Sequence, residues 1–263
     1  MKLILTLLVI TIFFLPAQSQ QWKLITSYSL GLPQQEMKET IQPASSFQLG
    51  VLYQLPGPLS QLLVGAELGI GGYAHKTIEQ TFQFGVNNSS KVPVNYSSNT
   101  FNADLQTRVN LLPNKNLIIP YINAKGGWYN FFSNVYVEDP ENPNNCKPLD
   151  KHNIINDATL YWSLGGGVQA DVALFSKKRK KPGKVLIDIA ANSVRGGTLD
   201  YINTKHLEDA QTFNDKDSKP LEVRFIKASS QRIYEHTVAQ VYTSPLRMLE
   251  FRAGVVIRLG KSR

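Results

Sequence analysis

The chain has 263 residues, of which 28 are Lys or Arg and 20 are Asp or Glu, so its net charge is +8. A single cysteine, Cys146, excludes a disulfide framework within the chain. No segment after residue 20 reaches the roughly 18 consecutive apolar residues that a membrane helix needs. Abundant glycine and aromatic residues, with turn signals throughout, favour an all-β fold in one large domain or two small ones.

The first 19 residues have the pattern of a secretory signal peptide. Lys2 precedes an apolar run from Leu3 to Leu15, and Ala17 and Ser19 supply the small residues at the −3 and −1 positions of a cleavage site. The run is too short for a membrane anchor. We therefore expect cleavage after Ser19 and a mature domain of residues 20–263.

Eight segments of the mature chain alternate between apolar and polar residues, the period of a β-strand with two unlike faces. Most are about ten residues or longer, which suits tilted membrane strands of about 9–11 residues. These predicted strands are residues 22–30, 47–53, 62–73, 101–111, 117–131, 159–174, 185–192 and 249–260.

The predicted connections alternate in length. They are short after the second, fourth and sixth strands, and long after the first, third, fifth and seventh. Outer-membrane barrels have short periplasmic turns and long outer loops. The sequence thus predicts a closed antiparallel transmembrane β-barrel of eight strands, with a secreted β-sandwich as the alternative.

The longest connection, about residues 195–247, is unusual for a loop without structure. Leu221–Lys227 and Ile233–Tyr242 alternate imperfectly within it. They form either a hairpin above the membrane, which we favour, or two further strands that would give a barrel of ten.

If the apolar faces meet lipid, charged side chains point into the lumen. Eight strands leave an interior just wide enough for side chains to fill, so paired charges would plug the barrel, and an ion path is the alternative. The expected lumen charges, five of each sign, are Glu67, Asp104, Asp171, Asp188 and Glu250 with Lys23, Arg108, Lys125, Arg252 and Arg258.

Two further surface features are expected at the membrane boundaries. Interfacial aromatic residues lie near the strand ends: Trp22, Tyr53 and Phe175 on the periplasmic side, Trp128 and Trp162 on the outer side. A basic turn lies on the periplasmic side, where it is either simply solvated or meets lipid phosphates or an acidic partner; its residues are Lys177, Lys178, Arg179, Lys180, Lys181 and Lys184. A secreted chain has no nuclear role, so no nucleic-acid partner is expected.

The four histidines give no sign of a catalytic or metal site. His75, His152, His206 and His236 fall in or beside the predicted outer loops, and none has a serine within two positions. Their spacing matches no triad or metal-binding pattern. We therefore expect that the chain is not an enzyme and carries no metal or cofactor.

The signal peptide, the eight alternating segments and the terminal sequence SPLRMLEFRAGVVIRLG together resemble the outer-membrane β-barrel proteins of Bacteroidetes. That group is similar to the small barrels of the OmpA and OmpX type. The resemblance implies a location in the outer membrane of a diderm bacterium. It also implies a structural or interaction role, with outer-membrane lipid and a protein of the envelope as partners. An enzyme acting on lipid and a narrow channel are the alternatives.

Overall fold

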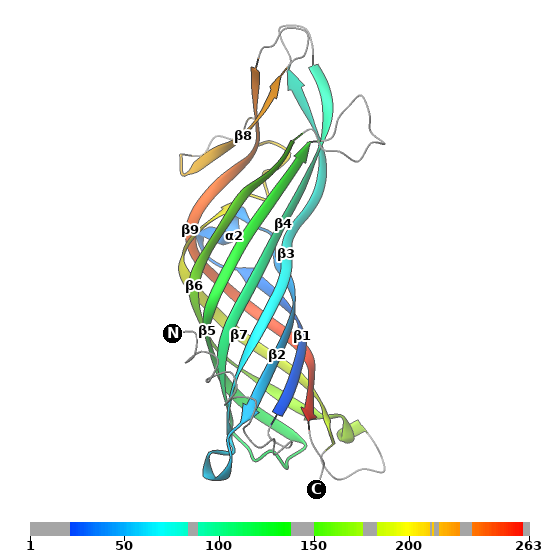
Figure 1. Cartoon of the computed structure of the whole chain (residues 1–263), viewed down its shortest axis with the longest axis vertical. Coiled ribbons are helices and arrows are strands. Elements are labelled where there is room, and N and C mark those ends of the chain that lie inside the picture. The colour runs from blue at the N-terminus through cyan, green and yellow to red at the C-terminus, as the bar shows by residue number, and fades with distance from the viewer. Residues whose placement is uncertain are drawn as a thin grey trace, which may run out of the picture.

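A computed structural model describes residues 22–83, 89–137, 150–175, 183–210, 212, 216–226 and 233–259. The proposed signal peptide, Cys146 and the basic residues 177–181 lie outside this part of the chain. The described residues form nine strands (Figure 1): β1 (Trp22–Pro33), β2 (Ala44–Gln54), β3 (Leu62–Gln83), β4 (Ser89–Asn110), β5 (Ile118–Val137), β6 (Asp150–Asp171), β7 (Val185–Ile202), β8 (Ser218–Ile226) and β9 (Ile233–Leu259).

Eight of these strands form a closed antiparallel barrel. Consecutive strands from β1 to β7 pair with each other, β7 pairs with β9, and β9 returns to pair with β1. The β1–β9 ladder runs from Trp22 opposite Leu259 to Pro33 opposite Met248. Closure gives the backbone groups of every barrel strand a partner, as hydrocarbon requires. The prediction of a closed, eight-stranded, all-β barrel is confirmed.

β8 belongs to a hairpin outside the closed barrel. Residues 248–259 of β9 pair with β1, whereas residues 233–242 of β9 pair with β8 on the same edge. The hairpin alternative is therefore correct and a ten-stranded barrel is not. The expected loop of about 195–247 is wrong in extent, because β7 continues to Ile202 and β8 and β9 occupy most of the remainder.

The strands extend well beyond the predicted segments. β3, β4 and β6 have 22 residues each, β5 has 20 and β9 has 27. Much of the long loops expected after the third and fifth strands is therefore strand. The structure above the membrane barrel consists of the upper halves of β3–β7, β8 and residues 233–247 of β9, and we call it the extension.

β4 shows why the alternation of apolar and polar residues does not predict the strands of the extension. Its even-numbered residues from Val92 onward face inward, but Val92, Val94 and Tyr96 are apolar whereas the even-numbered residues from 102 to 110 are polar or charged. The outward face changes in the opposite sense, from polar residues before Ser97 to apolar residues from Phe101 onward. β4 thus passes from a soluble type of barrel, with an apolar interior, into a membrane type, with an apolar exterior.

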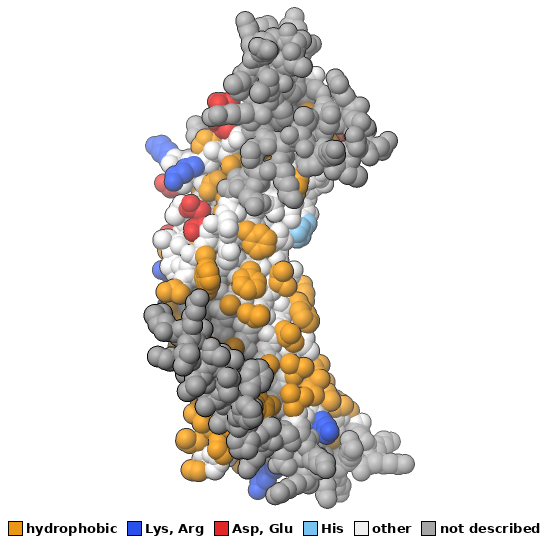
Figure 2. Space-filling view, viewed as in Figure 1, with side chains coloured by type: hydrophobic (Ala, Val, Ile, Leu, Met, Phe, Trp, Pro, Cys, Tyr) orange, Lys and Arg blue, Asp and Glu red, His pale blue; other side chains and the backbone are white. Residues whose placement is uncertain are grey.

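The outward apolar residues form a belt around the barrel below the extension (Figure 2). Side chains that are exposed in the protein include Leu105 at 72% and Leu160 at 79%. An apolar surface of this size is stable in lipid but not in water. Other members of the belt are Tyr28, Phe47, Leu49, Leu68, Ile70, Ile122, Leu164, Ile189 and Phe251.

The two ends of the barrel differ. At one end β1 begins and β9 ends (Figure 1), and the connections are short: a turn with the 3-10 helix η1 (Gly57–Leu59), residues 111–117, and the segment that begins with η2 (Val172–Phe175). The extension lies at the other end. Outer-membrane barrels have short turns in the periplasm and longer segments outside the cell, so we expect the short turns to be periplasmic and the extension to be external. Among the described residues, no helix is both long and apolar enough to cross a bilayer.

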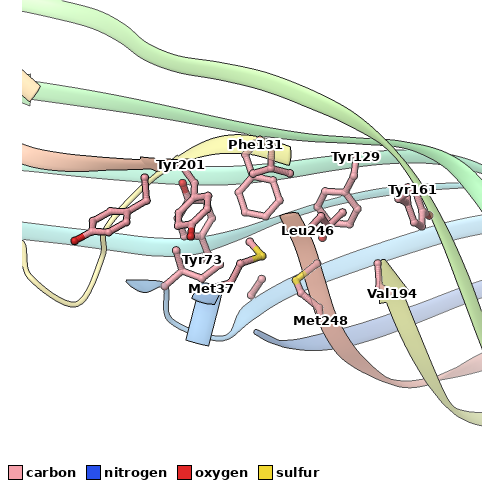
Figure 3. Close-up of a cluster of buried hydrophobic side chains, with 13 residues drawn as sticks. Met37, Tyr73, Tyr129, Phe131, Tyr161, Val194, Tyr201, Leu246 and Met248 are labelled. Carbon is pink, nitrogen blue, oxygen red and sulfur yellow. The ribbon is translucent and has the colours of Figure 1, made fainter. Parts of the chain in front are cut away.

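The interior contains three apolar clusters at different heights. The lowest, near the short turns, is a ring of Ile25, Leu52, Leu63, Ile119, Leu186 and Val256. The middle cluster joins aromatic rings from the barrel wall to Met37 of the short helix α2 (Glu36–Thr40), which lies inside the outer mouth (Figure 3). The highest lies in the extension and includes Ile78, Val94 and Val238.

Candidate functional site: the charged lumen

Charged side chains line the lumen from its periplasmic end, below the lowest apolar cluster, up to the middle apolar cluster. All ten residues expected there face inward. Nine of them are buried, and the side chain of Arg258, at the periplasmic end, is 19% exposed. Strand alternation alone produces this arrangement, because each residue lies two positions from the next inward residue on its strand.

Glu67 of β3 is the centre of the outer half of this network. Its two carboxylate oxygens accept hydrogen bonds from Lys125 Nζ and from Arg252 Nη2, each at 2.6 Å. Lys125 also lies 3.9 Å from Glu250 Oε2. Three strands, β3, β5 and β9, are thereby joined across the lumen by ion pairs in which both partners are buried.

Glu250 is held mainly by neutral donors. The side-chain amides of Gln48 on β2 and Asn192 on β7 donate to its two oxygens, each at 2.9 Å. Asp104 on β4 accepts at one oxygen, Oδ2, from Tyr161 Oη at 2.6 Å and from Asn102 Nδ2 at 2.9 Å. These bonds supply the partners that a buried carboxylate needs in a low-dielectric interior.

A second ion pair lies closer to the periplasm. Arg108 Nη1 is 3.3 Å from Asp188 Oδ1, and Tyr121 Oη donates to the other oxygen of the same carboxylate at 3.0 Å. The guanidinium of Arg108 also stacks over the Tyr121 ring, 3.9 Å from its centre. Gly167 leaves room for this ring, since a Cβ atom there would lie 2.6 Å from Tyr121 Oη.

The periplasmic end of the lumen contains Lys23, Arg258 and Asp171. Arg258 Nη1 lies 3.5 Å from Asp171 Oδ2, a longer separation than in the outer pairs. Lys23 Nζ donates to Asn114 Oδ1 at 3.1 Å. Asn114 belongs to the short turn after β4, so this turn folds back over the lumen.

The sequence pattern located the charges but missed the neutral residues that bind them. Gln48, Asn102, Tyr121, Tyr161 and Asn192 all occupy inward positions of their strands. The same alternation that selected the charges could have selected these residues. Asn114 has no such signal, because it lies in a turn.

The expected interfacial aromatic residues lie on the outer surface. Trp22 packs on Tyr53 with ring centres 4.9 Å apart, and Trp128, Trp162 and Phe175 are exposed. Lys184 of the basic turn is exposed at the periplasmic end. These positions agree with interfacial roles, which stay predictions.

His75 and His206 lie outside the lumen. His206 Nδ1 is 3.2 Å from Asp209 Oδ2 in the loop after β7, and His75 Nδ1 is 3.4 Å from Ser97 Oγ on the outer surface. In the part of the chain that the structure describes, no group of three or more His, Cys, Asp or Glu residues is placed to hold a metal ion.

The closed barrel, its apolar belt and its unequal ends define an outer membrane β-barrel protein. No protein-family model matches the sequence, and no curated protein is significantly similar to it. Membership of the Bacteroidetes barrel family therefore stays a prediction.

Two solved structures with a similar fold are Neisserial surface protein A and the outer membrane protease OmpT from Escherichia coli. The first is 8% identical, with a TM-score of 0.43, and the match covers 90% of this chain and 97% of that one. The second is 7% identical, with a TM-score of 0.37, covering 91% and 97%. Likeness at this identity concerns the fold alone.

The comparison with the protease corrects one expectation. The histidine pattern led us to expect that the chain is not an enzyme, yet a barrel of similar fold is a protease. The exclusion is therefore wrong, because this architecture is compatible with catalysis. The likeness assigns no activity to this chain.

Proposed function

We propose that the protein is a sealed outer-membrane barrel that presents its extension to a protein partner at the cell surface. The observation that carries this proposal is the change of faces along β4. The strand continues above the belt with an apolar inner face and a polar outer face. A protein that needed only to seal or brace the membrane would not require this additional ordered surface.

The interior supports a sealed lumen. The lowest apolar ring, the paired charges and the middle cluster around Met37 follow one another along the barrel axis. A continuous water path would have to break at least one of these layers. We therefore favour an interaction protein over a channel. Its insertion in the outer membrane requires export from the cytoplasm, which the proposed signal peptide at residues 1–19 would direct.

Photo-cross-linking in living cells tests the partner role. A photoreactive residue in place of Lys91, which is exposed on the extension, should give a discrete adduct with an envelope protein. The same residue in place of Leu105, on the belt of the same strand, should give lipid adducts but not that protein. An identical protein adduct from both positions, or none from several exposed positions of the extension, would contradict the proposal.

A further inference from the structure

Two positive side chains face each other at the periplasmic end of the lumen. Lys23 of β1 is directly opposite Arg258 of β9 in the ladder that closes the barrel. Both side chains point inward. The Cβ atoms of residues in such a pair lie about 4.5–5.5 Å apart, and like charges at this distance destabilise a sheet.

The atoms around this pair are mostly neutral oxygens. Asn114 accepts from Lys23 Nζ through its side-chain oxygen at 3.1 Å and from Arg258 Nη2 through its main-chain oxygen at 3.2 Å. Gly183 O accepts from Arg258 Nη1 at 3.0 Å. Carbonyl oxygens satisfy hydrogen bonds but carry no net charge to oppose the two cations.

The nearest carboxylate compensates only part of this charge. Asp171 lies 3.5 Å from Arg258 and already accepts from the backbone N–H groups of Ala173 and Gly183 at 2.9 and 2.7 Å. Among the described residues, no carboxylate lies within 4.0 Å of the Lys23 ammonium. Lys23, Arg258 and Asp171 together carry a net charge of +1.

The position of the pair indicates which anion can reach it. Lys23 is 2% exposed, but the Arg258 side chain is 19% exposed and provides access from the periplasm. Trp22, the residue before Lys23, packs on Tyr53 at the interfacial level where aromatic residues meet headgroups. A guanidinium beside an ammonium favours the oxygens of a phosphate group.

We propose that Lys23 and Arg258 form a binding site for a singly charged phosphate group at the periplasmic mouth. The group is either free phosphate or the phosphodiester of a lipid headgroup. It would lie between the two cations and relieve their repulsion. This site is independent of the extension and of the proposed partner role.

Thermal unfolding of the mature protein in a phosphate-free maltoside detergent tests the site. Inorganic phosphate should raise the unfolding midpoint of the wild type above its value in chloride at equal ionic strength. Lys23→Met removes one of the two facing charges, so it should abolish this rise and leave the midpoint in chloride unchanged or higher. Arg258→Gln should also abolish the rise and provides a second variant if Lys23→Met does not fold.

Lys184→Met is the matched control, because Lys184 is an exposed cation at the same end of the barrel, outside the pair. It should retain the response, which separates the site from the general stabilising effect of phosphate salts. A short-chain phosphatidylglycerol distinguishes the sources: stabilisation by lipid alone indicates a headgroup, and stabilisation by inorganic phosphate indicates the free ion. Equal midpoints in phosphate, lipid and chloride, or a response that persists in both lumen variants, would overturn the proposal.

Discussion

Glu67 is the single residue that joins the ion pairs in the outer half of the lumen. It is 1% exposed and accepts two charge-assisted hydrogen bonds from cations on different strands. Such bonds are stronger than hydrogen bonds between neutral groups, and their strength increases in a low-dielectric interior. Desolvating three charged groups is costly, so the network is stable only while its members remain together.

Removal of one cation should therefore lower the free energy of unfolding. Arg252→Ala leaves Glu67 with Lys125 alone and leaves Glu250 with less positive charge nearby. We expect a loss of about 3–5 kcal/mol in the free energy of unfolding, measured with urea in lipid vesicles. Arg195→Ala is the control, because Arg195 is exposed and its guanidinium lies over the Trp162 ring, 5.8 Å from the ring centre. Equal losses in the two variants would show that the lumen pairs contribute nothing specific.

Strand alternation is sufficient to identify the lumen charges from sequence but not to pair them. Arg252 and Glu67 lie on strands that are distant in the chain, and they meet only because the barrel closes with a particular tilt and stagger. Neither quantity can be read from the period of a strand. Alternation alone therefore leaves the partner of each lumen cation open among several carboxylates, and the register of the closed barrel identifies it.

At the scale of one element, β4 shows where the membrane part of the barrel ends. It keeps one alternation over 22 residues while the chemistry of its two faces is exchanged between Tyr96 and Phe101. A pattern that requires apolar residues on the outward face ends the strand where that face becomes polar. In β3 the change is further obscured by a bulge between Gly72 and Ala74, which shifts the alternation by one residue.

The height of the membrane boundary on β4 can be tested with two arginines on the same face. Leu105→Arg places a charge in the belt and should destabilise the barrel by about 2–4 kcal/mol, if it lies near the middle of the bilayer. Ser97→Arg lies eight residues earlier, above the belt, and should change stability by no more than about 0.5 kcal/mol. Urea unfolding in vesicles measures both. Similar costs at the two positions would mean that the boundary does not lie between them.

The extension should lose its order independently of the membrane barrel. Val94 is fully buried in the highest apolar cluster, so Val94→Asp places an unpaired carboxylate there. We expect rapid cleavage of the extension by added protease, with the heat-modifiable gel migration of the barrel retained. Lys91→Asp, exposed on the same strand, should leave cleavage unchanged. If Val94→Asp also abolishes heat modifiability, the two parts fold as one unit.

At the scale of the whole molecule, we expect one end of the barrel to face the outside of the cell and the other end to face the periplasm. The loop between β7 and β8, at the extension end, carries Glu208, whose side chain is 71% exposed, and the short turn after β4 carries exposed Lys115. In a Cys146→Ser background, a membrane-impermeant thiol reagent should label Glu208→Cys in intact cells and should label Lys115→Cys only after the outer membrane is opened. The reverse pattern would invert the orientation.

A sealed barrel requires an interior that is filled along its length. An apolar ring lies between the periplasmic charges and the ion pairs of Glu67, a second apolar cluster lies above those pairs, and α2 lies in the outer mouth. The most direct measurement is the conductance of the wild-type protein in planar lipid bilayers, with heat-modifiable migration used to confirm that the inserted protein is folded. We predict a conductance close to zero at all applied voltages. A large and steady conductance would contradict the sealed barrel and would establish a channel.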